Sequence, residues 1–286
     1  MSKKNLQKVE PTQVNVLALG AGVQSSTLAF LLATKELNLE IKAAIFSDTK
    51  GEPKEVYKWL DYLKKELPFP VLVVQHGKGL TQDLIDSVEL GTRVAAPPFH
   101  TLDEETDKRA IVRRTCTYEY KIKPMLKACR SLIGAKPNER IKDYHVNLLM
   151  GISLDEIQRC RESQHKWLTH KFPLIDLRMR RSDCFEWMKN HGYAEPPRSA
   201  CTYCPYHSDH EWRRLKMHHP EDFAEAVKMD KLVRNGVKGT KNNKLFLHTS
   251  CKPLDEIDFR NDLDKGQLDF WEENPMQLEC QGMCGL

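Results

Sequence analysis

The sequence predicts a doubly wound parallel α/β sheet of the Rossmann-like type, followed by a helical, cysteine-bearing C-terminal extension. Short apolar segments alternate with helical patterns over the first 75 residues, which is typical of βαβ units. A glycine-containing turn joins the first expected strand to the first expected helix, and such a turn offers an anion site. From residue 181 onward the pattern becomes helical and includes a C-x-x-C pair.

The elements follow in order from the apolar patterns. The first two helices are expected over residues 22–37 and 53–67, with Pro53 in the first turn of the second. Residues 77–115 have weak periodicity, so we expect an irregular segment there, a candidate mobile lid. Later helices are expected at 182–192 and as two helices between 207 and 236. The five expected strands cover residues 14–20, 41–49, 70–75, 144–153 and 165–175.

Length and composition limit the possible classes of protein. The 286 residues suit one large α/β domain with an appendage, and we expect a flexible N-terminus (1–13), a nucleotide-binding domain (14–198) and a helical region (199–286). No apolar run has the length of a membrane span or a signal core, which favours a cytoplasmic protein without a membrane partner. Nine cysteines are many for a reducing compartment, where grouped cysteines are metal ligands or redox thiols.

The turn "LGAGVQSS", Leu19 to Ser26, is the first candidate site. Its glycines permit close approach of a ligand, and its backbone amides with the helix N-terminus can bind phosphate. The simpler alternative is a plain strand–helix turn of small residues. The turn lacks the G-K-[ST] ending of a nucleotide P-loop and the third glycine of G-x-G-x-x-G. The candidate phosphate-binding residues are Gly20, Ala21, Gly22, Val23, Gln24, Ser25 and Ser26.

This turn resembles the PP-loop, usually S-G-G-x-D-S, of the ATP pyrophosphatases, a group that includes phosphosulfate reductases and tRNA thiolation enzymes. It departs from that pattern at Gly20 and Ala21, and also at Gln24, the position at which the pattern has aspartate. Four further stretches resemble reductase segments in the same order: residues 46–63, 116–126, 151–156 and 172–188. The resemblance implies a PP-loop ATPase-type fold binding ATP or another adenosine nucleotide. It also implies that Asp48 and Thr49 face the adenosine, that Lys121 contacts phosphate, and that Gly151 and Ser153 join the nucleotide site.

The cysteines form the second candidate site. In the adenosine phosphosulfate reductases that this chain resembles, a cysteine pair and a later C-x-x-C bind a [4Fe-4S] cluster, which implies Cys116, Cys201 and Cys204 as ligands here. Position 117 is threonine, so Cys280 is the expected fourth ligand. Cys284, in the tail "MCGL", resembles the reductases' nucleophilic cysteine and is the expected catalytic residue. The last two roles could be exchanged, or both thiols could be ligands. Zinc is the second choice of metal, and buried structural cysteines are the third interpretation.

Other polar groups carry weaker signals. Arginine and lysine clusters at 113–114, 178–181, 213–216 and 238–244 are individually typical of a solvated face, but together they favour a polyanionic partner. Asp155 and Glu156 either bind Mg²⁺ or cap a helix, and capping is favoured. The sequence supports no Ser-His-Asp arrangement.

Three functions remain open. The first is an enzyme that adenylates its substrate with ATP and transfers sulfur to it with help from an iron–sulfur cluster. The second is a sulfonucleotide reductase that uses Cys284. The third is a non-enzymatic nucleotide- or nucleic-acid-binding protein with structural zinc. The partners considered are tRNA or DNA, a sulfur or electron donor protein, and further copies of the chain.

Overall fold

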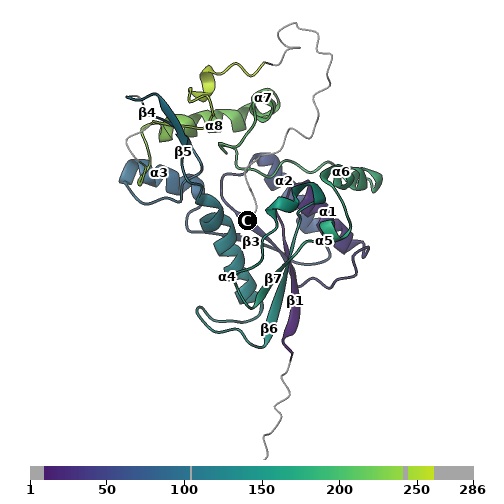
Figure 1. Cartoon of the computed structure of the whole chain (residues 1–286). Coiled ribbons are helices and arrows are strands. Elements are labelled where there is room, and N and C mark those ends of the chain that lie inside the picture. Colours follow the sequence, from purple (N-terminus) through teal and green to yellow (C-terminus); the bar gives the residue numbers. More distant parts are fainter. Residues whose placement is uncertain (1–9, 104, 241–243, 261–286) are drawn as a thin grey trace, which may run out of the picture. The chain divides into compact units, whose positions relative to one another are not determined.

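A five-stranded parallel sheet forms the centre of the fold, as the sequence predicts. The computed structural model describes residues 10–103, 105–240 and 244–260. The sheet has the order β3-β2-β1-β6-β7 and is flanked by helices (Figure 1). Its strands are β1 (Thr12–Ala18), β2 (Ala43–Asp48), β3 (Val71–Gln75), β6 (Tyr144–Met150) and β7 (Leu168–Lys171).

The order of the strands creates a switch point between β1 and β6. The chain runs from β1 outward to β2 and β3, and then returns to place β6 on the other side of β1. The register pairs Val16 with Leu148 and Ala18 with Met150, so β1 and β6 end level with each other. Ligands of doubly wound sheets bind at such a point, outside the carboxyl ends of the strands.

The described residues group into two compact units. The first contains the residues up to Ser47 together with Lys58–Val74 and Pro124–Arg198. The second contains Asp48–Tyr57, Gln75–Lys123 and the described residues from Ser199 onward. The predicted division into domains stays a prediction, and the two units are described separately below.

The first unit packs helices against the sheet. The helix α1 (Val23–Ala33) is buried from Val23 to Leu32, which agrees with a sequence that is small or apolar except at Gln24. It contacts α5 (Pro173–Asp176) and α6 (Arg181–Asn190). The other helices with residues in this unit are α2 (Lys54–Glu66), α4 (Lys123–Leu132) and the 3₁₀ turn η2 (Leu154–Arg159).

The second unit combines helices with a small antiparallel sheet in the order β5-β4-β8. A separate apolar core that includes Trp212, Tyr203 and Phe99 holds it together. The elements are α3 (Leu80–Leu90), β4 (His100–Asp103), β5 (Lys108–Ile111), the π-helical turn η1 (Tyr118–Ile122), α7 (Asp209–His218), α8 (Pro220–Val233), β8 (Lys244–Phe246) and the turn η3 (Leu254–Glu256).

Three predicted elements need correction. Residues 77–115 are not an irregular lid, because α3 and the β4–β5 hairpin lie there. The buried face of α3 consists of Leu80, Leu84 and Ser87. This spacing is helical, but the polar residues between them make it hard to see in the sequence. The fifth strand is limited to β7, since Pro173 begins α5. Finally, β1 starts at Thr12, so the first strand includes two residues expected in the flexible N-terminus.

Within the described ranges, no helix combines the length and the apolar character needed to cross a bilayer.

Candidate nucleotide and thiol sites

The predicted phosphate loop lies at the switch point of the sheet, in the first unit. The Leu19 amide still donates to the Ile45 carbonyl (2.9 Å), so the loop starts as soon as the strand ends. Ala21 has a positive φ of 59°, which a non-glycine residue adopts at a cost of about 1 kcal/mol. Gly22 then begins α1 with no side chain capping the helix. The first amides of α1 have no partner within the helix, so this end of α1 can bind an anion.

The hydroxyl groups of the loop divide into two kinds. Ser25 Oγ accepts a hydrogen bond from the Gly20 amide (3.1 Å) and donates one to the Gly22 carbonyl (3.2 Å), which fixes the shape of the loop. Ser26 Oγ, in contrast, accepts from Trp59 Nε1 (2.8 Å), and its amide donates to the Gly22 carbonyl. Ser26 is fully buried, so it anchors α1 in the core rather than facing a ligand.

Gly151 and Ser153 lie against this loop, as the resemblance implies. A Cβ atom on Gly151 would be 2.6 Å from the Ser25 Cα and 2.7 Å from its amide nitrogen, so only glycine fits. Ser153 is fully buried, and its hydroxyl accepts from Gln24 Nε2 (3.4 Å). The first unit therefore brings together nine of the predicted nucleotide-binding residues. Seven are the loop residues 20–26, and two are Gly151 and Ser153 after β6.

Gln24 has a specific partner in this structure. Its Nε2 also donates to Glu156 Oε2 at 3.1 Å, and Glu156 forms a salt bridge with Arg159. Glu156 is 7% exposed, so a nearly buried carboxylate lies beside the first turn of α1. An aspartate at position 24 would place a second negative charge against it. Asp155 accepts from the Arg181 amide (3.1 Å), which is a capping role.

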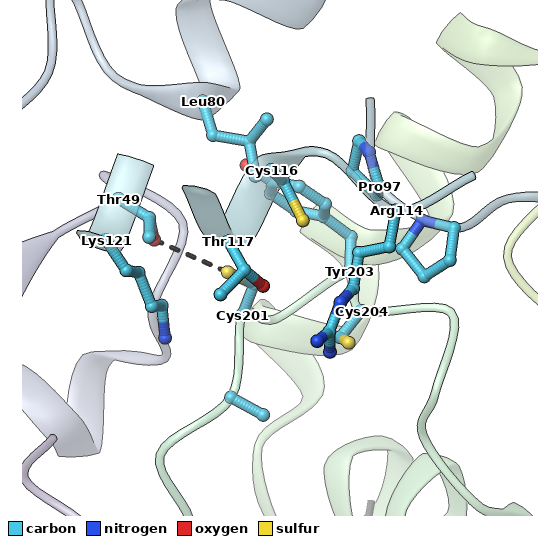
Figure 2. Close-up of a pocket in the computed structure, with 12 residues that line it drawn as sticks. Thr49, Leu80, Pro97, Arg114, Cys116, Thr117, Lys121, Cys201, Tyr203 and Cys204 are labelled. Carbon is cyan, nitrogen blue, oxygen red and sulfur yellow. Dashed lines mark hydrogen bonds between the residues drawn. The ribbon is translucent and has the colours of Figure 1, made fainter. Parts of the chain in front are cut away.

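The three predicted ligand cysteines line a single pocket in the second unit. Figure 2 shows Cys116, Cys201 and Cys204 around this pocket, with Thr49 and Lys121 on one side. Apolar walls dominate the rest. The complete lining consists of Thr49, Leu80, Pro97, Pro98, Arg114, Cys116, Thr117, Lys121, Ala200, Cys201, Tyr203 and Cys204.

The C-x-x-C turn is firmly anchored. The Cys204 amide donates to the Cys201 carbonyl (2.9 Å), and the Thr202 amide donates to the Gly51 carbonyl (2.7 Å). The Tyr203 ring between the two cysteines is fully buried, and its hydroxyl lies 2.8 Å from Thr81 Oγ1. A Cβ atom on Gly51 would lie 2.5 Å from the Tyr203 hydroxyl oxygen and 2.9 Å from its Cζ, so a side chain there would collide with the tyrosine. The turn thus holds its thiols on a preformed support.

Cys201 has a polar environment on one side. Its Sγ lies 3.4 Å from Thr49 Oγ1 and 4.0 Å from Glu52 Oε1, and Lys121 Nζ pairs with the same Glu52 oxygen at 3.2 Å. Burial chiefly raises the pKa of the Cys201 thiol, and the Glu52 carboxylate raises it further. Lys121 and the Thr49 hydroxyl oppose this shift. Cys201 is therefore a protonated thiol at neutral pH.

Arg114 adds a cation to the pocket. Its guanidinium lies 5.8 Å from the Tyr206 ring centroid, and Figure 2 shows it beside Cys204. The buried Nη1 atom has no hydrogen-bond partner within the described part of the chain. A buried donor without a partner costs about 1–3 kcal/mol, so an anion in this pocket would be stabilised.

The pocket offers three thiol donors, which suit a [4Fe-4S] cluster or zinc. Across the described ranges, however, no three His, Cys, Asp or Glu side chains are gathered closely enough to hold a metal ion. The donor types and the adjacent cation fit an anionic thiolate-bound group, whereas the spacing requires the thiols to move toward it. Cys280 and Cys284 lie outside the described residues.

The remaining predicted nucleotide residues belong to the second unit. Thr49 and Lys121 line the thiol pocket, and Lys121 pairs with Glu52. Asp48 accepts from the Tyr57 hydroxyl (2.8 Å) and from the Lys50 amide (2.7 Å). Its carboxylate is thus already held by protein donors, and contact with an adenosine stays a prediction.

The sequence analysis missed two groups. The first is Glu52, which reaches Cys201 from a segment without a metal-site pattern, and the second is the place of Arg114 in the thiol pocket, since the sequence indicated Arg114 only as part of a basic cluster. A Ser-His-Asp row also exists: His248 lies 2.8 Å from both Asp209 Oδ1 and Ser250 Oγ. The Ser250 amide also donates to His248 Nδ1 (3.1 Å), the nitrogen that lies near Ser250 Oγ. This hydrogen bond occupies the lone pair of Nδ1 and indicates a structural role for the row.

A glycine loop at the switch point of a parallel sheet is typical of doubly wound α/β proteins. A scan against protein-family models and a search of curated proteins found no match to this sequence. Among solved structures, a phosphoadenylyl-sulfate (PAPS) reductase from Candida auris, in a phosphate complex, is similar at 10% identity and a TM-score of 0.41; the match covers 66% of this chain and 76% of that one.

A second similar structure is the U34-tRNA thiolase NcsA from Methanococcus maripaludis with its [4Fe-4S] cluster. It is 14% identical, with a TM-score of 0.39, and the match covers 79% of this chain and 73% of the thiolase. A reductase and a tRNA thiolase are two kinds of protein that the sequence motifs resemble. Both TM-scores are below 0.5, so the fold class stands on the sheet topology of this chain itself.

Proposed function

We propose that this protein is an adenosine-nucleotide-dependent enzyme that activates a substrate oxygen by adenylation and replaces it with sulfur. The phosphate loop at the switch point carries the proposal. Its strained Ala21, uncapped helix start and obligatory Gly151 contact support a shape made for close approach of a ligand. The loop amides would bind the phosphates and position the α-phosphorus.

The proposed chemistry has two displacements. The substrate oxygen attacks the α-phosphorus of ATP, an O–P bond forms, and pyrophosphate leaves. A hydrosulfide from a separate sulfur donor then attacks the adenylated carbon, a C–S bond forms, and AMP leaves with the oxygen. Cys284 remains the candidate thiol for this step as a carrier: its persulfide, received from a persulfide donor, would attack with the outer sulfur, and a second thiol would then break the S–S bond, which releases the thiolated product and leaves a disulfide on Cys284.

The thiol pocket supports sulfur handling rather than simple adenylation. Cys116, Cys201 and Cys204 would hold a [4Fe-4S] cluster, with Cys280 as the candidate fourth ligand, and zinc is the competing occupant. Bound through the first three thiols alone, such a cluster would supply an open iron position for sulfur, whereas Cys280 as fourth ligand would fill that position. The chain's own residues would compensate its negative charge through Arg114 and Lys121. The Tyr203 anchor would keep the C-x-x-C turn in place.

The test compares two nucleotides. Anaerobically prepared protein is incubated with ATP and with bulk tRNA or DNA, and pyrophosphate is measured; a parallel reaction measures sulfite released from adenosine phosphosulfates. Pyrophosphate release that depends on the added polymer is expected, together with its loss in Gly151→Ala. Sulfite release without pyrophosphate would replace the proposal with a sulfonucleotide reductase. Turnover of neither nucleotide would leave only a binding protein.

A further inference from the structure

The first unit carries a basic and aromatic surface at the end of the sheet opposite to the phosphate loop. It consists of residues 127–145, which run from α4 through a loop into β6, and of residues 165–167 before β7 (Figure 1). These segments contain six basic and two acidic residues. Their net charge of +4 equals that of the whole chain, so the remainder of the sequence is neutral on balance.

The basic side chains of this surface are exposed to solvent and to a ligand. Lys127, Lys136, Arg140, Lys142 and Lys166 are all exposed. Within the described residues, none of these five side chains has an ion-pair or hydrogen-bond partner, unlike Lys121 in the thiol pocket. Glu139 turns its carboxylate toward its own loop, where Oε2 accepts from the Lys136 amide (2.7 Å). The negative charge of Glu139 is already counted in the net charge of +4.

Arg130 connects the segments of this surface. Arg130 Nη2 donates to the carbonyls of Lys136 (2.6 Å) and Glu139 (2.7 Å), and its guanidinium lies 5.7 Å from the Trp167 ring centroid. The Trp167 carbonyl in turn accepts from the Val146 amide (2.9 Å). These contacts connect the basic loop to the starts of β6 and β7, so the backbone that carries the basic residues has a fixed position.

Aromatic rings lie among these cations. Tyr144 is 40% exposed at the first position of β6, two residues before Val146, which pairs with Leu168 at the start of β7. The exposed His165 ring lies 5.7 Å from the Trp167 ring. Exposed rings between lysines and arginines suit unpaired nucleobases, which stack on rings while cations contact phosphates.

We infer that this surface docks a nucleic acid with unpaired bases, RNA or DNA, and that this polymer carries the base modified at the phosphate loop. The identity of the substrate rests on the proposed function, whereas the binding itself does not. The seven residues of β6 separate the two ends of the sheet by about 20 Å, so a mononucleotide cannot reach both. An extended polyanion can.

Fluorescence anisotropy of the full chain without ATP tests the surface. The probes are labelled 20-nucleotide single-stranded RNA, the same sequence as DNA, and polyglutamate as a polyanion without bases. Lys136→Ala/Arg140→Ala/Lys142→Ala is expected to weaken nucleic-acid binding about tenfold and to reduce the slope of log K against log salt by about 2. The matched control, Lys58→Ala/Lys65→Ala/Lys228→Ala, removes the same charge from other exposed positions.

A further variant tests the aromatic part of the surface. Tyr144→Ala, a change at an exposed ring, should weaken single-stranded binding about fivefold or more and leave the salt slope unchanged. The polymer with the lower Kd identifies the substrate class. Equal losses in the triple variant and its control, or polyglutamate binding as tight as nucleic acid, would overturn the inference. Nucleic-acid binding that persists in a protein without nucleotide turnover would contradict the proposed function alone.

Discussion

Gly151 lies directly against the backbone of Ser25: a Cβ at position 151 would be 2.6 Å from the Ser25 Cα. This contact joins the carboxyl end of β6 to the phosphate loop. Gly151→Ala must therefore push the loop away or bend β6. We expect nucleotide affinity to fall at least tenfold, measured by isothermal titration calorimetry with ATP, together with a lower Tm.

A matched glycine separates the loop from general stability. Gly134 has a φ of +70° and open space around its α-carbon. Gly134→Ala should cost about 1 kcal/mol through backbone strain and leave ATP affinity unchanged. An equal loss of ATP affinity in both variants would show that the Gly151 contact does not shape the binding site.

The Gln24–Glu156 pair predicts an effect opposite to that expected from the PP-loop pattern that the sequence resembles. Gln24→Asp restores the usual aspartate, but it also places a carboxylate where Gln24 Nε2 now donates to Glu156. We expect ATP affinity to fall about tenfold from like-charge repulsion. The double variant Gln24→Asp/Glu156→Gln should recover most of it. Tighter ATP binding in the single variant would refute this reading of the pair.

The environment of Cys201 predicts two opposite changes in reactivity. The Glu52 carboxylate raises the pKa of this thiol, so Glu52→Gln lowers that pKa and increases the thiolate fraction at pH 8. Alkylation of Cys201 by iodoacetamide, followed by peptide mass spectrometry, should become faster. Thr49→Val removes a hydroxyl that lowers the pKa, so alkylation should become slower.

Cys129 provides the internal control for this experiment. It is fully buried, and burial raises its pKa to about 12. Its slow alkylation should not change in either variant. The assignment fails if Cys201 reacts at the same rate in Glu52→Gln, Thr49→Val and the unaltered protein.

The support of the C-x-x-C turn predicts coupled stability effects. Gly51→Ala brings a methyl group within 2.5 Å of the Tyr203 hydroxyl and should destabilise the fold by about 2–3 kcal/mol. Tyr203→Phe loses the Thr81 hydrogen bond and should cost about 1 kcal/mol. Chemical denaturation of the double variant should show less than the sum, because the colliding oxygen is gone. Strict additivity would mean that the two residues do not press on each other.

The sequence predicted the elements whose signals are local. The strand–glycine–helix pattern at Leu19 to Ser26 located the loop, because glycines and the following apolar helix lie within a few residues. The parallel sheet followed from five short apolar segments. The helix α3 was missed since its buried face includes Ser87 beside Leu80 and Leu84, while the apolar residues Val88 and Leu90 are exposed.

Features built from distant segments could not be predicted in this way. The β4–β8 pairing joins residues more than 140 positions apart, and Glu52 approaches Cys201 from a segment nearly 150 residues earlier. The burial of the Ser26 hydroxyl depends on Trp59, which local spacing does not reveal. The basic surface also needed the fold, because Arg130 and Trp167 meet only when β6 and β7 pair.

The most direct test of the thiol pocket is an iron, sulfide and zinc analysis of anaerobically purified protein, with an absorption spectrum. The account predicts about four iron and four sulfide per chain and a broad band near ~400 nm that is lost on reduction. Iron should fall in Cys116→Ser, Cys201→Ser and Cys204→Ser but not in Cys160→Ser, a half-buried thiol outside the pocket. One zinc per chain without iron, or iron unchanged in all four variants, would contradict it.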